Sequence, residues 1–124
     1  MHLYEYAVVR VVPSVEREEF INVGVILNCK QQGMLHCRIF LDEKKLTALD
    51  KDADMGIIRS YLESFRQIAE GQPNGSPIAL QDATSRFRWL TAVRSSIIQT
   101  SRPHSGFSSD LSETLDKLFI KYVL

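Results

Sequence analysis

The sequence has few of the features from which an activity is usually recognised. Only two cysteines occur, Cys29 and Cys37, too few for a disulfide framework, and we expect both to be small buried side chains in a reducing compartment. No apolar run approaches the roughly 18 residues that a membrane-spanning helix needs, and the N-terminus lacks the pattern of a secretory signal. We therefore expect a cytoplasmic protein.

Motifs of metal binding, phosphate binding and catalysis are missing as well. His36 adjoins Cys37, but neighbouring residues of a strand point to opposite faces, so the pair does not predict a zinc site. There is no Gly-rich phosphate loop followed by Lys, no G-x-S-x-G, no H-E-x-x-H and no C-x-x-C. The sequence accordingly predicts no metal, no cofactor and no catalytic residue. It does not favour an enzyme, although catalytic groups that assemble from distant positions would leave no motif.

An excess of either charge is also absent, because 15 basic and 15 acidic side chains cancel. This balance argues against attraction of the whole surface to nucleic acid or to an anionic membrane. The proportions of hydrophobic residues, 44%, and charged residues, 24%, are ordinary for a globular protein. We therefore expect residues 1–124 to form a single folded domain.

Three segments near the N-terminus have the alternating pattern of β-strands, and we expect strands over residues 3–12, 20–29 and 34–41. In the second of them, a uniform apolar face is formed by Ile21, Val23, Val25, Leu27 and Cys29. One apolar face per strand and short connections predict an antiparallel sheet. The segment 95–101 is a candidate fourth strand, and residues 102–110 are expected to form a loop.

The rest of the chain has helical periodicity. An amphipathic helix is predicted from Asp52 or Asp54 to Gly71, a second helix over residues 79–93, and a final one that Asp110 caps. The predicted fold is α+β: a three- to four-stranded, mainly antiparallel sheet with about three helices packed on one face.

One face of this sheet is predicted to be mixed rather than apolar. Strand alternation places polar and aromatic side chains away from the helices, namely Arg10, Asn22, Gly24, Asn28, His36, Arg38, Tyr4, Tyr6, Phe20 and Phe40. Aromatic rings beside cationic and amide groups suit recognition of a protein, and they also suit stacking on single-stranded nucleic acid. The alternative is an outer face on which these side chains pack on one another. The candidate partner face consists of Tyr4, Tyr6, His36, Arg38 and Phe40.

Arg10 has a second interpretation. A guanidinium in an apolar strand is costly to bury unless a carboxylate accepts its hydrogen bonds, and the following loop offers Glu18 and Glu19. The structural hypothesis is an ion pair that fixes this loop, with Arg10, Asn22 and Gly24 clustered on one face. The functional hypothesis makes Arg10 a clamp for the carboxylate or phosphate of a ligand.

A third candidate is the segment from Arg86 to His104, which has no acidic residue. Its basic side chains are Arg86, Arg88, Arg94, Arg102 and His104, interleaved with Phe87 and Trp89. Such a segment can contact phosphates. A helix would scatter these arginines over several faces, however, and the two aromatic side chains suit the core.

Four stretches of the sequence resemble one known family. They are YEYAVVRVVP, EEFINVGVIL, VRSSIIQTSRP and TLDKLFIKYV, which together reach from near the first residue to the last. The sequence resembles a bacterial family of proteins of unknown function, number 3037, and its pattern is matched at Arg10, Glu19, Asn22 and Gly24. Where that family tends toward Ser-Pro-Arg, this chain has Ser101-Arg102-Pro103.

The resemblance implies a small, stand-alone cytoplasmic protein without established catalytic residues. Some members are encoded near kinases that resemble HipA, which implies an accessory role in a toxin–antitoxin or kinase-containing module. The leading hypothesis is a non-enzymatic interaction module that binds a protein, such as a HipA-like kinase, through the mixed sheet face or the edge strand. A homo-oligomer is a further possibility. The alternatives are a nucleic-acid-binding protein that uses the segment 86–104, and an enzyme or phospholigand-binding protein with a site around Arg10.

Overall fold

The structure is a computed structural model that describes all residues from 1 to 124. The strands are β1 (His2–Val11), β2 (Ile21–Cys29), β3 (Met34–Ile39), β4 (Ile98–Thr100) and β5 (His104–Ser108). The helices are α1 (Glu43–Leu49), α2 (Met55–Ala69), the 3₁₀-helix η1 (Pro77–Leu80), α3 (Ala83–Leu90) and α4 (Leu111–Tyr122).

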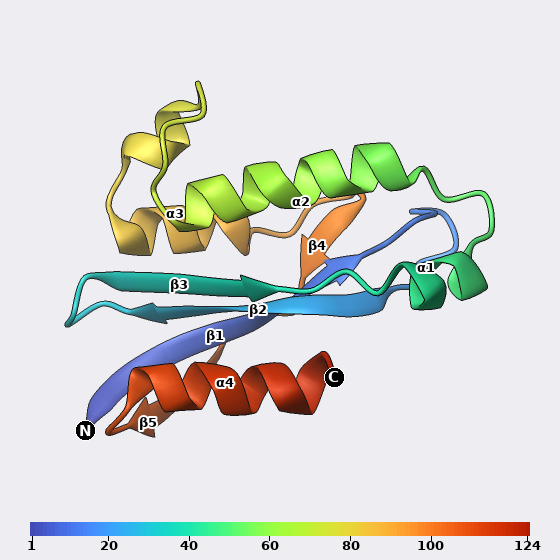
Figure 1. Ribbon diagram of the computed structural model, residues 1–124. Coiled ribbons are helices and arrows are strands. Elements are labelled where there is room, and N and C mark those ends of the chain that lie inside the picture. Colours follow the sequence, from blue (N-terminus) through green and yellow to red (C-terminus); the bar gives the residue numbers. More distant parts are fainter.

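The strands form one antiparallel sheet in the order β3-β2-β1-β4, and β5 also pairs with β1 (Figure 1). β4 and β5 share the same side of β1, β4 along residues 9–11 and β5 along residues 2–6. The predicted α+β fold with an antiparallel sheet is confirmed, as is the fourth strand. The predicted loop over residues 102–110 is wrong where β5 forms, because a five-residue strand with one large apolar side chain shows no alternation to recognise.

β2 departs from regular alternation. Gly24 pairs with Val9, but the next pair is Asn22 with Arg10, so Val23 is the extra residue of a β-bulge. A Cβ on Gly24 would lie 2.6 Å from the backbone oxygen of Arg38, so a side chain does not fit there without a shift.

The bulge exchanges the faces of the strand. Val23 and Ile26 enter the same core, whereas Val25 packs on the opposite side of the sheet. The predicted uniform apolar face of residues 21–29 is therefore wrong beyond Gly24. Both faces of β2 are covered, in accordance with its nearly continuous apolar sequence.

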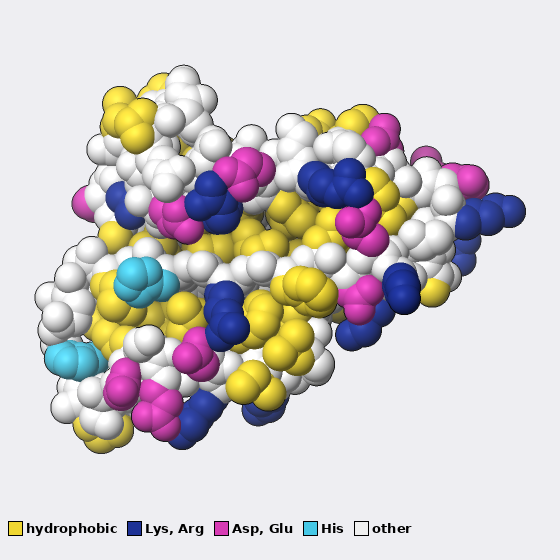
Figure 2. All heavy atoms as spheres, viewed as in Figure 1, with side chains coloured by type: hydrophobic (Ala, Val, Ile, Leu, Met, Phe, Trp, Pro, Cys, Tyr) yellow, Lys and Arg dark blue, Asp and Glu magenta, His cyan; other side chains and the backbone are white.

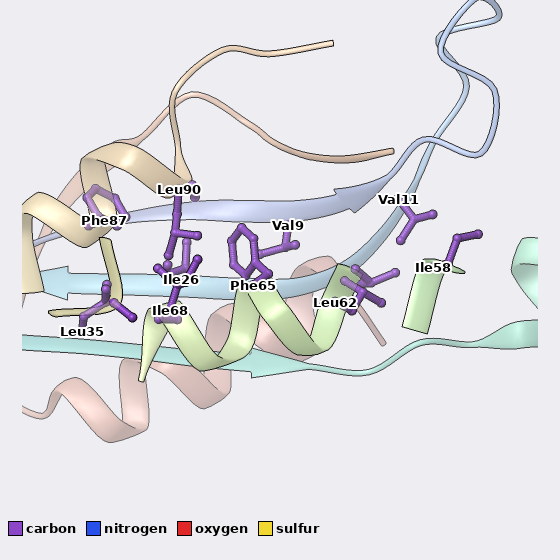
Figure 3. Packing of buried hydrophobic residues seen from close by; sticks show 14 of the residues in the cluster. Val9, Val11, Ile26, Leu35, Ile58, Leu62, Phe65, Ile68, Phe87 and Leu90 are labelled. Atoms are coloured by element: carbon purple, nitrogen blue, oxygen red, sulfur yellow. The ribbon is translucent and has the colours of Figure 1, made fainter. Parts of the chain in front are cut away.

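α2, η1 and α3 cover one face of the sheet (Figure 1). Asp54 begins α2 by accepting a hydrogen bond from the Ile57 N–H, and Gly71, at φ +69°, follows its end. The apolar stripe of α2 packs on the sheet beside Phe87 of α3, which is fully buried (Figure 3). The second predicted helix is shorter than expected, because Thr91 ends it and Val93 is fully exposed.

α4 lies on the opposite face of the sheet (Figure 1). Asp110 caps it, as predicted, by accepting a hydrogen bond from the Glu113 N–H. Phe119 and Val123 pack on Val25 of β2 and form a second, smaller core. The prediction that the helices share one face is thus corrected for α4, because an amphipathic stripe shows that a helix packs but not on which side of a sheet.

Candidate functional site

Arg10 and Asn22 lie next to each other on the face of the sheet that α4 covers. They pair across β1 and β2, and Asn22 Nδ2 donates a hydrogen bond to the Tyr122 carbonyl at the end of α4, 3.1 Å away. Gly24 is placed differently, because it pairs with Val9 beyond the bulge. The predicted cluster of Arg10, Asn22 and Gly24 is therefore corrected to the pair of Arg10 and Asn22. Gly24 instead allows the close approach of the Arg38 backbone.

Arg10 has no carboxylate partner. Its guanidinium carbon lies 4.2 Å from the centroid of the Phe20 ring, and its Nε is buried without a hydrogen-bond partner. Glu19 pairs instead with Arg17 at 2.6 Å, and Glu18 lies in the left-handed region at φ +59°. The predicted ion pair with Glu18 or Glu19 is thus absent, because the loop turns its carboxylates away from the sheet face.

A second polar atom beside Arg10 is also unpartnered. Asn22 Oδ1 is buried without a hydrogen-bond donor, so two of the four such buried side-chain atoms belong to this one pair of residues. Buried polar groups in folded proteins nearly always have a partner. An open donor and an open acceptor therefore make the Arg10–Asn22 pair the least satisfied part of the sheet.

α4 covers part of the predicted partner face. Tyr6 Oη lies 3.1 Å from Tyr122 Oη. Arg38 pairs with Asp116 and lies over the Phe119 ring, 4.4 Å from its centroid. Tyr6 and Arg38 are therefore used to hold α4 on the sheet.

The remaining members of that face differ in exposure. Tyr4 lies over Gly106 of β5, where a Cβ would be only 2.5 Å from Tyr4 Oη. His36 and Phe40 are exposed to solvent. Whether these residues bind a partner stays a prediction; three of the five are exposed, His36, Phe40 and Arg38, and Arg38 is already paired with Asp116.

The two tyrosine hydroxyls are electrostatically unequal. Burial, together with the hydrogen bond to Tyr122, raises the pKa of Tyr6 to about 12. The same hydrogen bond lowers the pKa of Tyr122. Either hydroxyl can donate in this bond, and the pair ties the end of α4 to β1.

Beyond the end of α4 the sheet face is open. We call the open patch the group formed by Arg10, Phe20, Phe40 and Ile120. Its apolar members are substantially exposed: 44% for Phe20, 50% for Phe40 and 59% for Ile120. Figure 2 shows hydrophobic side chains gathered over this end of β3 and the C-terminal half of α4.

Strand pairing and the packing of α4 explain why the side chains of the open patch lie at the same end of the molecule. The Phe40 N–H donates to the Val23 carbonyl at 2.7 Å, which places Phe40 beside the start of β2, where Phe20 lies. Arg38 of β3 pairs with Asp116 of α4. Ile120 lies one helical turn beyond Asp116, and Phe40 lies two strand residues beyond Arg38, and these two steps have similar lengths. α4 and β3 thus bring Ile120 and Phe40 to the same end of the molecule.

The predicted basic segment does not form one surface. Arg86 donates a hydrogen bond to the Gln81 carbonyl at 2.6 Å and packs on Gly71. Arg88 extends toward Glu5 of β1, 3.8 Å away. These two arginines therefore serve contacts within the fold.

The other basic side chains point elsewhere. Arg94 folds back on α3, where it donates to the Trp89 carbonyl and lies over the Trp89 ring. Arg102 is exposed between β4 and β5, and the His104 ring lies 5.4 Å from the Tyr6 ring. Nucleic-acid binding by this segment stays a prediction, without a common basic face that would support it.

Two hollows have no counterpart in the sequence predictions. One, of about 570 Å³, lies between the loop after β1 and the loop before β4 and is lined by Val12, Val15, Glu18, Val93, Arg94, Ser95 and Gln99. The other, of about 180 Å³, is more apolar and lies between α2, α3 and β4. No group of three or more metal-ligating side chains is arranged to hold an ion. The lining residues come from segments that meet only in the fold, so no sequence pattern indicated either hollow.

Comparison with known proteins assigns the chain to a family. The family described as "Protein of unknown function (DUF3037)" matches residues 6–123. The chain belongs to the DUF3037 family. The DUF3037 match spans the whole open patch, from Arg10 to Ile120. No curated protein and no solved structure matches the chain, and none of its helices has both the length and the apolar character needed to cross a bilayer.

Proposed function

We propose that this DUF3037 protein is a non-enzymatic interaction module that binds a protein partner through the open patch. The observation that carries the proposal is Arg10, whose half-buried guanidinium is stacked on the exposed Phe20 ring without a carboxylate. A carboxylate from a partner would supply the acceptor that this chain does not provide, in the charge-assisted geometry that arginine favours.

The composition of the open patch suits a protein interface. Phenylalanine and arginine are among the residues enriched at the centres of interfaces, where a few buried aromatic and arginine side chains dominate the binding energy. The patch combines three exposed apolar side chains, Phe20, Phe40 and Ile120, with one charged group, Arg10, which lies over the Phe20 ring. The hollows described above are lined by other residues, so the patch offers a surface rather than a pocket.

The expected partner presents apolar side chains next to an aspartate or glutamate. The apolar side chains would cover Phe40 and Ile120, and the carboxylate would reach the guanidinium of Arg10. The family resemblance makes a HipA-like kinase the first partner to test, and this choice rests on the resemblance alone.

Site-specific photocrosslinking in cells tests the proposal directly. A photoreactive phenylalanine analogue replaces Phe40 in one variant and Val93, which is fully exposed and outside the open patch, in a matched control. We expect a covalent adduct with one partner at position 40 and none at position 93. Adding Arg10→Met to the Phe40 variant should abolish the adduct, because the carboxylate then has no cation to bind.

Two outcomes contradict the proposal. Equal adducts at both positions would indicate non-specific contact. An adduct that survives Arg10→Met would show that the guanidinium does not take part in recognition. Co-expression with a HipA-like kinase as the only candidate partner is a separate test, because the crosslink at position 40 in cells does not presuppose the kinase. If position 40 crosslinks to a protein in cells but not to the co-expressed kinase, the surface is right and the partner is wrong.

A further inference from the structure

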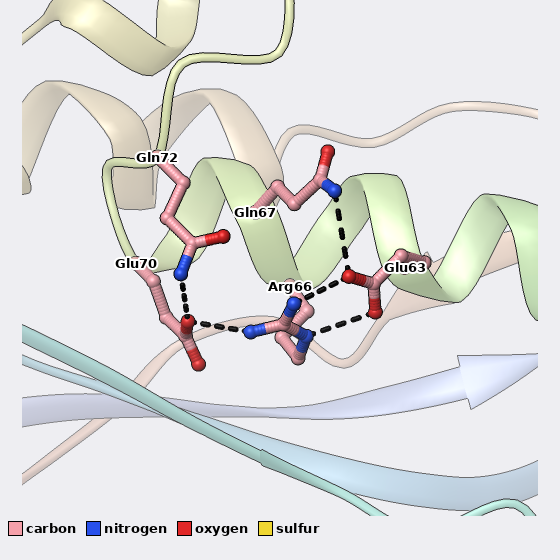
Figure 4. Close-up of polar contacts among 5 residues, drawn as sticks. All are labelled: Glu63, Arg66, Gln67, Glu70 and Gln72. Carbon is pink, nitrogen blue, oxygen red and sulfur yellow. Dashed lines mark hydrogen bonds and ion pairs between the residues drawn. The ribbon is translucent and has the colours of Figure 1, made fainter.

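The two edges of the sheet differ in how well they are protected against pairing with another strand. β3 is flanked by charge on both faces. On one face Arg38 pairs with Asp116, and on the other Arg66 pairs with Glu63 and Glu70 (Figure 4). Charged groups along an edge disfavour the addition of a strand, because their hydration would be lost.

The other edge is formed by β4 and β5, and β5 is unprotected. Its sequence, HSGFS, contains no Lys, Arg, Asp or Glu. Phe107 is 67% exposed, and Leu3, its neighbour on β1, is 47% exposed. β4 is only three residues long and is followed by Arg102 and Pro103, which interrupt the edge.

Hydrogen bonds within the sheet show which backbone groups of β1 face this edge. The Val12 N–H donates to the Ile97 carbonyl, and the Ser101 N–H donates to the Val8 carbonyl. The even-numbered residues of β1 therefore direct their backbone groups toward β4 and β5. Strand alternation extends this direction to residues 2, 4 and 6.

The same alternation decides which groups of β5 are free. Residues 2, 4 and 6 pair with Ser108, Gly106 and His104, whose backbone groups thus bond to β1. The N–H and C=O groups of Ser105 and Phe107 must then point away from the sheet. β5 presents two outward residues, with one residue between them.

We propose that β5 pairs with β5 of a second copy of this chain, antiparallel, about a two-fold axis at Gly106. Ser105 of each copy then lies opposite Phe107 of the other, and each such pair exchanges two N–H···O bonds. Pro103 and the bend at Ser109 end the strand on its two sides. The register centred on Gly106 is therefore the one that keeps every bonded residue within the strand.

A second copy matches this edge in charge and in shape. The pairing places His104 opposite Ser108 and brings no like charges together. Gly106 has no side chain at the axis, and the Tyr4 ring lies over it; an aromatic ring over an edge glycine supports strand pairing. The joined sheet also covers part of each Phe107 ring.

The contact is small, since stable interfaces bury at least about 1,200 Å² in total and a five-residue strand pair buries less. We therefore expect a weak dimer with a dissociation constant in the range of roughly tens to hundreds of micromolar. β5 pairs with residues 2–6 of β1, whereas the open patch contains Arg10 at the other end of that strand, so dimerisation leaves the patch free.

Sedimentation equilibrium from about 10 µM to about 1 mM tests the dimer. The unmodified chain should change from monomer to dimer over this range. Phe107→Lys should remain monomeric, because it places two like charges at the paired edge. His36→Lys, an exposed substitution on the β3 edge, is the matched control and should dimerise as the unmodified chain does.

Amide hydrogen exchange supplies a readout specific to the register. At low concentration the amides of Ser105 and Phe107 should exchange fast, whereas that of Gly106 is protected by its bond to β1. At high concentration Ser105 and Phe107 should become protected, by about tenfold when nine-tenths of the chains are dimeric. A chain that stays monomeric at about 1 mM overturns the proposal. So does a dimer that survives Phe107→Lys, or one in which these two amides still exchange fast.

Discussion

Replacing Arg10 by Met has opposite effects on the free energy of unfolding, depending on whether the guanidinium is paired with a carboxylate. The substitution keeps an unbranched side chain of similar length and removes both the charge and the buried Nε. If Arg10 belonged to a buried ion pair, removing it would cost about 3–5 kcal/mol, because a carboxylate would be left buried without its partner. The structure shows no such carboxylate.

The magnitude follows from two opposing contributions. Loss of the cation–π contact with Phe20 costs about 0.5–1 kcal/mol at a partly exposed site. Removal of a buried, unpartnered N–H relieves a penalty of about 1–3 kcal/mol. Arg10→Met should therefore range from neutral to stabilising by about 2 kcal/mol in the free energy of unfolding.

Urea unfolding followed by far-UV circular dichroism and by Trp89 fluorescence measures the change, with an unaltered m-value as the condition for comparing midpoints. Arg38→Met is the matched control, because Arg38 has both a carboxylate partner, Asp116, and an aromatic one, Phe119. It should lose about 0.5–2 kcal/mol. Destabilisation of Arg10→Met by about 3 kcal/mol or more would refute the reasoning and restore the ion pair.

Three further predictions concern stability. Gly24→Ala should cost about 1–3 kcal/mol in urea unfolding, because the new Cβ meets the Arg38 carbonyl at 2.6 Å; Gly56→Ala, in the open first turn of α2, should cost nothing, and equal losses would exclude the steric cause. Phe87→Ala should lose about 3–5 kcal/mol, because Phe87 is fully buried in the main core; a loss below about 1 kcal/mol would contradict this packing. Burial, followed by the charge of Glu70, raises the pKa of the Cys37 thiol from 9.0 to about 12. Stability should thus be constant below pH 9 and fall above it by at most about 1.4 kcal/mol per pH unit. Cys37→Ala should remove that part of the slope, and identical slopes in unfolding experiments from pH 8 to 11 would contradict the shift.

Local signals in the sequence were reliable because their causes lie within a few residues. Asp52 or Asp54 was predicted to cap one helix and Asp110 another, and in the structure Asp54 and Asp110 each accept a hydrogen bond from an N–H three residues on. The faces of β2 could not be predicted in the same way, because the bulge at Val23 depends on how β1 pairs with it. One signal was available: the apolar run from Val23 to Leu27, broken only by Gly24, is typical of a strand covered on both faces.

The candidate site was predictable in part for a similar reason. The adjacency of Arg10 and Asn22 follows from antiparallel pairing of consecutive strands, and the structure contains it. The predicted ion pair of Arg10 with Glu18 or Glu19 was wrong, because the direction of the loop that carries these two residues depends on contacts elsewhere in the fold. Phe20, which the guanidinium does contact, was already assigned to the same predicted face.

The position of β1 in the middle of the sheet has a consequence for synthesis on the ribosome. β1 leaves the ribosome first, yet β4, β5 and α4, which pair with it or cover its sheet, come from the last part of the chain. Tyr6 must wait for Tyr122, 116 residues later, before its hydroxyl is bonded. Until then a nascent β1–β3 meander displays one unpaired strand edge and one bare apolar surface, both of which favour aggregation. The sheet is therefore completed only after β4 and β5 have left the ribosome, and messages truncated before β4 should yield chains that depend on chaperones.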